Sequence, residues 1–128
     1  MLVNIINLPD NEAEFKIVQM YHNEKPILLC GSRKLGIKNF HGLILEQYLK
    51  EQNINYDSFA PDEKFPNWLL PKLKLKDTYN VVGMGKMGID QSIHYVQLPY
   101  GSSHDYKIGV NTEFNKLIKE TFKHKFDN

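Results

Sequence analysis

Residues 14–21 read EFKIVQMY, and this stretch decides the fold class. An extended backbone sends successive side chains to opposite faces of a sheet. Phe15 and Ile17 then point to one face of the sheet. Val18 and Met20 point to the other face. Because both faces carry apolar groups, we expect this strand to lie in a sheet that is covered on both sides.

The rest of the chain supplies the other strands and the helices that would cover the sheet. Apolar periodicity becomes helical over residues 40–52, behind Asn39 as N-cap, and again from Phe114 to Phe122, behind Asn111 as N-cap. The order β-β-β-α-loop-β-β-α predicts an α/β (α+β) fold, with a single mixed sheet of about five to six strands and one helix on each face. Besides residues 14–21, the expected strands are residues 2–7, 27–30, 79–82 and 92–98.

Length and composition limit the organisation of the chain. Its 128 residues fit one domain, residues 1–128, with an irregular, proline-containing excursion at about residues 60–77. The 16 Lys and Arg residues balance 15 Asp and Glu residues, so net charge gives no reason to expect a nucleic-acid partner.

Cysteine content and hydropathy bear on the compartment. Cys30 is the only cysteine, which excludes an internal disulfide and a cysteine-rich metal site and suits a reducing compartment. The first residues lack the pattern of a signal peptide, and no apolar run approaches the ~20 residues that a membrane span needs. We therefore expect a cytoplasmic monomer with no membrane partner and neither a cofactor nor a metal ion.

Residues 83–88 read GMGKMG, which satisfies the pattern G-x-G-x-x-G after an expected strand. A dinucleotide-binding fold also needs a helix that begins in this turn and a second parallel strand that ends in an acidic residue. Gly88-Ile89-Asp90 would interrupt such a helix, so the sequence disfavours this fold. Two interpretations stay open: a glycine-rich loop that approaches a phosphate beside Lys86, or an ordinary hairpin turn.

His41 differs from the other four histidines because it falls at the expected N-terminus of a helix. Unpaired N–H groups and the helix dipole favour an anion there. The same dipole disfavours the imidazolium ion, which keeps a neutral base available near pH 7. Ser103, His104 and Asp105 are adjacent in the chain, but sequence neighbours rarely have the geometry of a catalytic triad. His41 is therefore the candidate for acid–base chemistry on a phosphoryl group.

Several short motifs follow one another along the chain. They are Phe15-Lys16, Arg33 eight residues before His41 in Phe40-His41, Gly83-x-Gly85-Lys86, and Tyr100-Gly101-Ser102-Ser103. Their order and spacing resemble those of the phosphohistidine phosphatase (janus/ocnus) family. The resemblance covers about residues 3–122. The family has an arginine where this chain has Lys86, and a shorter stretch before the glycine motif.

The resemblance implies a mixed sheet with a helix on each side and a shallow, metal-independent phosphate site. It implies hydrolysis of phosphohistidine on a protein, or of a small phosphoramidate, with His41 as general base or nucleophile. The phosphate or substrate contacts that it implies are Lys16, Arg33, Gly83, Gly85, Lys86, Ser102 and Ser103.

Two other functions stay open. The first is a non-catalytic regulatory domain on the same fold that binds phosphate or a phosphoprotein, with the excursion covering the site or forming an interface anchored by Trp68. Such a domain would show saturable binding without turnover. The second is a structural interaction domain, in which Lys16, Arg33 and His41 would not converge in space.

Overall fold

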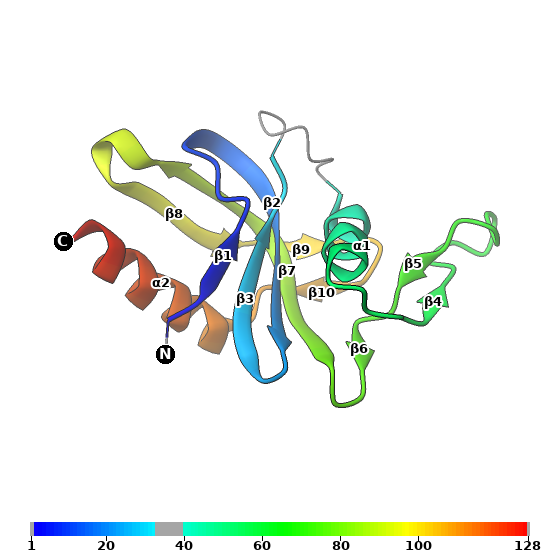
Figure 1. Ribbon diagram of the computed structural model, residues 1–128. Helices are drawn as coiled ribbons and strands as arrows, with labels where there is room; N and C mark the ends of the chain where they lie inside the picture. The colour runs from blue at the N-terminus through cyan, green and yellow to red at the C-terminus, as the bar shows by residue number, and fades with distance from the viewer. Residues whose placement is uncertain (1, 33–39, 128) are drawn as a thin grey trace.

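The computed structural model describes residues 2–32 and 40–127. Its main sheet has six strands in the order β1-β3-β2-β7-β6, and β8 pairs with the opposite end of β7 from β6 (Figure 1). The pairing of β1 with β3 is parallel and the other pairings are antiparallel, so the sheet is mixed. The six strands are β1 (Asn4–Ile6), β2 (Asn11–His22), β3 (Lys25–Cys30), β6 (Lys74–Leu75), β7 (Tyr79–Asp90) and β8 (Tyr95–Tyr100).

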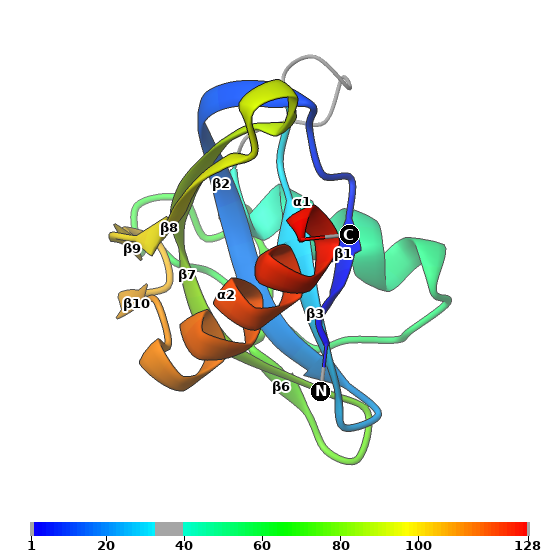
Figure 2. The same ribbon diagram turned by 90° about the vertical axis from the view of Figure 1, so that its left-hand side faces the viewer.

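One helix covers each face of this sheet, α1 (His41–Glu51) on one side and α2 (Thr112–Phe126) on the other (Figure 2). Val18 and Met20 of β2 belong to the same buried cluster as the apolar residues of α1. Phe15 and Ile17 belong to the cluster that includes α2. In the described part of the chain, neither helix has the length and apolar character to cross a membrane. The two-sided apolar pattern of β2 therefore predicted the fold class correctly.

The two helices begin differently. The side chain of Asn111 accepts a hydrogen bond from the Phe114 N–H at 2.8 Å, which confirms the expected N-cap of α2. For α1 the expected cap, Asn39, lies outside the described residues. Phe40 occupies the N-cap position and makes no side-chain cap hydrogen bond. The N–H groups in the first turn of α1 thus donate no hydrogen bond to a side chain at the cap position.

The excursion contains short elements of its own. β4 (Ser58–Phe59), just before the excursion, pairs antiparallel with β5 (Leu70–Pro71) inside it, and the two strands form a hairpin beside α1 (Figure 1). After β8, the chain forms a second small hairpin from β9 (Ser102–Ser103) and β10 (Ile108–Gly109). A single 3-10 turn, η1 (Gln91–Ile93), joins β7 to β8. The motif at residues 100–103 therefore ends β8 and forms β9.

The glycine-rich string is neither a loop nor a hairpin turn, which corrects the sequence-based expectation. β7 runs without a break from Tyr79 to Asp90 and includes the whole string. Glycine is needed because other groups approach the strand closely. A Cβ atom on Gly83 would collide with the Gln19 side chain and lie 2.6 Å from the backbone nitrogen of Asn111. A Cβ on Gly85 would collide with the carbonyl of Tyr100.

Replacing Gly83 with alanine should therefore destabilise the protein. The added methyl group displaces the fully buried Gln19 amide, so we expect a loss of about 1–3 kcal/mol in the free energy of unfolding. Urea denaturation measures this loss. Gly109→Ala is the matched control, because its Cβ would meet its nearest atom, the Gly101 carbonyl oxygen, at 3.3 Å. Equal stability of Gly83→Ala and wild type would contradict the close approach.

Candidate functional site

His41 is the first residue of α1, and its imidazole is buried, with 6% of the residue exposed. Its Nε2 atom lies 2.9 Å from the carbonyl oxygen of Gly85 in β7. A carbonyl oxygen only accepts hydrogen bonds, so Nε2 carries the proton and donates. The lone pair of the neutral ring is then on Nδ1. This contact joins the start of α1 to the central sheet and fixes the tautomer of the ring.

The surroundings of His41 favour its neutral form. Burial is the main cause that lowers its pKa below the ordinary value of 6.5, and the positive charges of Lys16 and Lys86 lower it further. The hydrogen bond to Gly85 and the negative charge of Asp105 act in the opposite direction without reversing the shift. His41 is therefore an uncharged base at neutral pH.

Two lysines stand beside this base. Lys16 of β2 and Lys86 of β7 are direct cross-strand partners, so their side chains leave the same face of the sheet. This is the face that α1 covers, because Val18 two positions along β2 packs in the α1 cluster. Like charges placed directly opposite each other destabilise a strand pair. A bound anion would offset that repulsion.

Neighbouring side chains hold both ammonium groups. The Nζ atom of Lys16 lies 5.1 Å from the ring centroid of Phe40, the residue before His41. The Nζ atom of Lys86 lies 2.7 Å from Oε1 of Glu14, and this ion pair is the main cause that raises the pKa of Lys86. Lys86 is partly exposed, so its ammonium can reach a ligand from solvent.

The other predicted contacts fall in different places. Gly85 contributes its carbonyl group to His41, whereas Gly83 lies against Gln19 and the N-cap of α2, on the opposite side of the sheet. Ser103 is buried, and its hydroxyl accepts a hydrogen bond from the backbone N–H of Tyr106 at 3.2 Å. Ser102 is exposed on the same short strand.

Arg33 lies outside the described residues. Among the described candidates, the structure thus brings together His41, Lys16, Gly85 and Lys86.

Asp105 and Phe40 lie at the site, although the sequence pattern does not indicate them as site residues. Asp105 was considered only as the neighbour of His104, yet its charge acts on His41. No local pattern connects Asp105 with His41, since they are distant in sequence. Phe40 appeared only as part of a motif, and its contact with Lys16 depends on where β2 meets α1.

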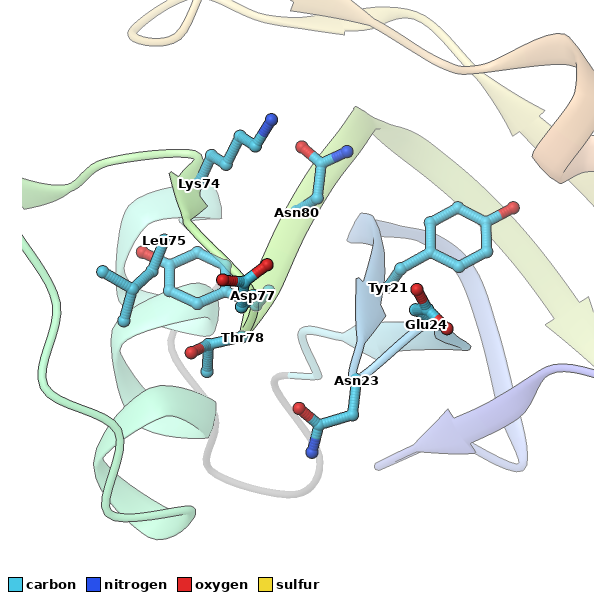
Figure 3. A pocket seen from close by; sticks show the side chains of 9 residues that line it. Tyr21, Asn23, Glu24, Lys74, Leu75, Asp77, Thr78 and Asn80 are labelled. Carbon is cyan, nitrogen blue, oxygen red and sulfur yellow. The ribbon is translucent and has the colours of Figure 1, made fainter.

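The group formed by His41, Lys16, Gly85 and Lys86 (the His41 group) does not lie at the large cavity. A cavity of about 730 Å³ opens between the β2–β3 and β6–β7 turns, lined by residues that include Tyr21 and Asn80 (Figure 3). Tyr21 and Asn80 are cross-strand partners about 20 Å along β7 from the Lys16–Lys86 pair. Glu24 and Asp77 also line this cavity beside one cation, Lys74, and the excess of carboxylates disfavours a phosphate there.

Neither a group of metal ligands nor a similar protein points to a function for this site. In residues 2–32 and 40–127, no three side chains of His, Cys, Asp or Glu are grouped so that they could hold a metal ion. No protein-family model, curated protein or solved structure matches this chain. The geometry of the His41 group therefore carries the functional argument.

The lowered pKa of His41 has a measurable consequence. We expect the Cε1 proton of His41 to titrate in NMR spectra with a pKa below 6.5, because burial and two lysines disfavour the cation. In the unfolded chain the ring binds its proton at the ordinary pKa. The free energy of unfolding should therefore decrease as pH falls from 6.5 through the lowered pKa, and this decrease should then level off.

The control is His41→Asn, which removes this titration and leaves the other four histidines. Its stability should depend less on pH over the same interval, as measured by urea denaturation. A His41 resonance that titrates above 6.5 would contradict the neutral imidazole.

Proposed function

We propose that this protein is a phosphohistidine phosphatase that hydrolyses the P–N bond of a histidine-phosphorylated protein or a small phosphoramidate. One observation carries the proposal: a neutral imidazole, fixed through Nε2, lies beside two lysines at the start of a helix. A base and two cations are what phosphoryl transfer to water requires. The motif order described above supports membership of the phosphohistidine phosphatase family.

The binding step uses charge and the helix terminus. Lys16 and Lys86 bind the phosphoryl oxygens, and the N–H groups in the first turn of α1 add the positive end of the helix dipole. A phosphate group bound in this way offsets the repulsion between the two lysines. As the P–N bond breaks, these groups stabilise the charge on the phosphoryl oxygens.

The chemical step uses Nδ1 of His41. As general base, Nδ1 takes a proton from water while the water oxygen forms a bond to phosphorus. The P–N bond breaks, the leaving imidazole nitrogen takes up the proton that Nδ1 had accepted, and inorganic phosphate is formed. As nucleophile, Nδ1 would instead form its own P–N bond while the substrate P–N bond breaks and the substrate imidazole leaves with a proton from solvent. Water would hydrolyse the enzyme P–N bond in a second step. Intact-mass measurement after an alkaline quench distinguishes the two routes, since only the second gives a phosphorylated enzyme.

The decisive experiment measures release of inorganic phosphate from a histidine-phosphorylated protein, with and without EDTA. We expect turnover that EDTA does not change. Saturable binding of the phosphorylated protein without turnover would instead identify a regulatory phosphate-binding domain. Absence of both would overturn the phosphate site itself.

We also propose a cytoplasmic location. Cys30 is the only cysteine in the sequence, and it is a buried free thiol. Burial raises its pKa strongly, which keeps it protonated and unreactive. A chain whose only cysteine is an unreactive thiol suits a reducing compartment.

A further inference from the structure

The tip of the β4–β5 hairpin presents large apolar side chains to solvent. Phe65 is 61% exposed, Leu69 is 52% exposed and Trp68 is 44% exposed. Contiguous exposed apolar groups of this size are a feature of interaction sites. Tryptophan in particular is enriched among residues that dominate binding energy in protein interfaces.

The backbone of the tip is held by its own turns. The N–H of Phe65 donates to the Asp62 carbonyl at 3.0 Å, and the N–H of Trp68 donates to the Phe65 carbonyl at 3.0 Å. The Asp62 side chain accepts a further hydrogen bond from the Lys64 N–H at 2.9 Å. The apolar side chains are therefore displayed by an ordered segment, which reduces the entropy lost when a partner binds.

The base of the hairpin is fixed next to His41. Leu70 is buried and fills the space directly over Gly42, the residue that follows His41. The Tyr106 hydroxyl donates to the Pro71 carbonyl at 2.7 Å, and its ring packs against Phe59 with centroids 5.4 Å apart. The exposed Leu69 is therefore followed directly by Leu70, which packs on the first turn of α1. Figure 1 shows the hairpin projecting outward beside α1.

We propose that Phe65, Trp68 and Leu69 form a docking surface for the polypeptide that carries the phosphohistidine. This inference rests on the proposed function, and it concerns where a protein substrate is held beyond its phosphoryl group. A small phosphoramidate ion is bound by cations and N–H groups, and an apolar tip adds nothing to its binding. A phosphorylated protein that reaches His41 extends beyond the phosphoryl group. An apolar segment next to its phosphohistidine would meet the tip.

The first test uses fluorescence, because Trp68 is the only tryptophan. Titration with a histidine-phosphorylated protein that lacks tryptophan should shift the emission of Trp68 to shorter wavelength as water leaves the indole. Free phosphoramidate should leave the emission unchanged. Phe65→Ala keeps the probe and should raise the midpoint concentration about tenfold, as expected for loss of an interface anchor. No shift with the phosphorylated protein, or an equal shift when this protein is concentrated alone, would overturn the proposal.

The second test compares rates on two substrates. Trp68→Ala should lower kcat/KM about tenfold for the histidine-phosphorylated protein and leave it unchanged for phosphoramidate. The matched control is Ile93→Ala, an exposed apolar residue in η1, which should change neither rate. An equal fall on both substrates, or no fall on either, would contradict docking at the tip. If the wild type hydrolyses neither substrate, the proposed function fails and the fluorescence titration alone decides the docking surface.

Discussion

His41→Ala is expected to lower the rate of phosphate release from a histidine-phosphorylated protein by about 10²–10⁴-fold. The substitution removes the Nδ1 base together with the Nε2–H group that Gly85 accepts. No other described histidine has an equivalent position, at a helix start with two lysines beside it. Single-turnover assays under saturating enzyme separate this loss of chemistry from any loss of binding.

The matched control is His104→Ala. His104 is exposed and lies beside Asp105, so a triad built from Ser103, His104 and Asp105 would require it. The His41 mechanism predicts nearly wild-type turnover for His104→Ala. The urea midpoint of His41→Ala shows whether the variant remains folded. Near wild-type turnover by a folded His41→Ala protein would remove His41 from the mechanism.

Lys16→Met is expected to lower kcat/KM by about 10²–10³-fold, since it removes a cation that stabilises the phosphoryl oxygens in the transition state. It should also move the acidic limb of the pH–rate profile to higher pH. The positive charge of Lys16 lowers the pKa of His41, so its removal raises that pKa and the base becomes protonated at higher pH. A profile of kcat/KM against pH measures both effects together.

Loss of folding would not explain this result. Lys16 faces Lys86 directly, so its replacement removes a repulsion between like charges, which offsets the loss of its contact with the Phe40 ring. The urea midpoint of Lys16→Met should therefore stay close to that of the wild type. Lys25→Met serves as the control, because Lys25 is exposed at the start of β3, opposite His22 at the far end of β2 from Lys16. A decrease in rate without a shift of the acidic limb would indicate that Lys16 acts away from His41.

The sequence was sufficient for those features that depend on local alternation. Apolar side chains on both faces of residues 14–21 predicted a sheet that is covered on both sides, and Asn111 predicted the start of α2. The glycine-rich string misled because glycine favours turns in isolation. Glycine is needed at these positions because Gln19 and Tyr100, which belong to other strands, approach β7 closely. Contacts at such separations leave no periodic signal in the string itself.

The site could be predicted only in part, because some of its contacts join residues that are distant in sequence. The position of His41 at a helix start follows from local periodicity, and the family resemblance implied Lys16 and Lys86 as phosphate contacts. That the two lysines stand opposite each other depends on the register between β2 and β7. That Asp105 acts on His41 depends on the return of the chain after β8. Neither relation is encoded by spacing along the chain.

The hydrogen bond from His41 to Gly85 also bears on how the protein is made. A ribosome delivers the chain from its N-terminus, so Lys16 and His41 emerge long before Gly85 and Lys86. Until β7 has been synthesised and has joined β2, the imidazole has no partner for Nε2 and the second ammonium is missing. The nascent chain therefore lacks the assembled group of residues until Lys86 has emerged and β7 has paired with β2. Under the proposed function, turnover would begin only at that point.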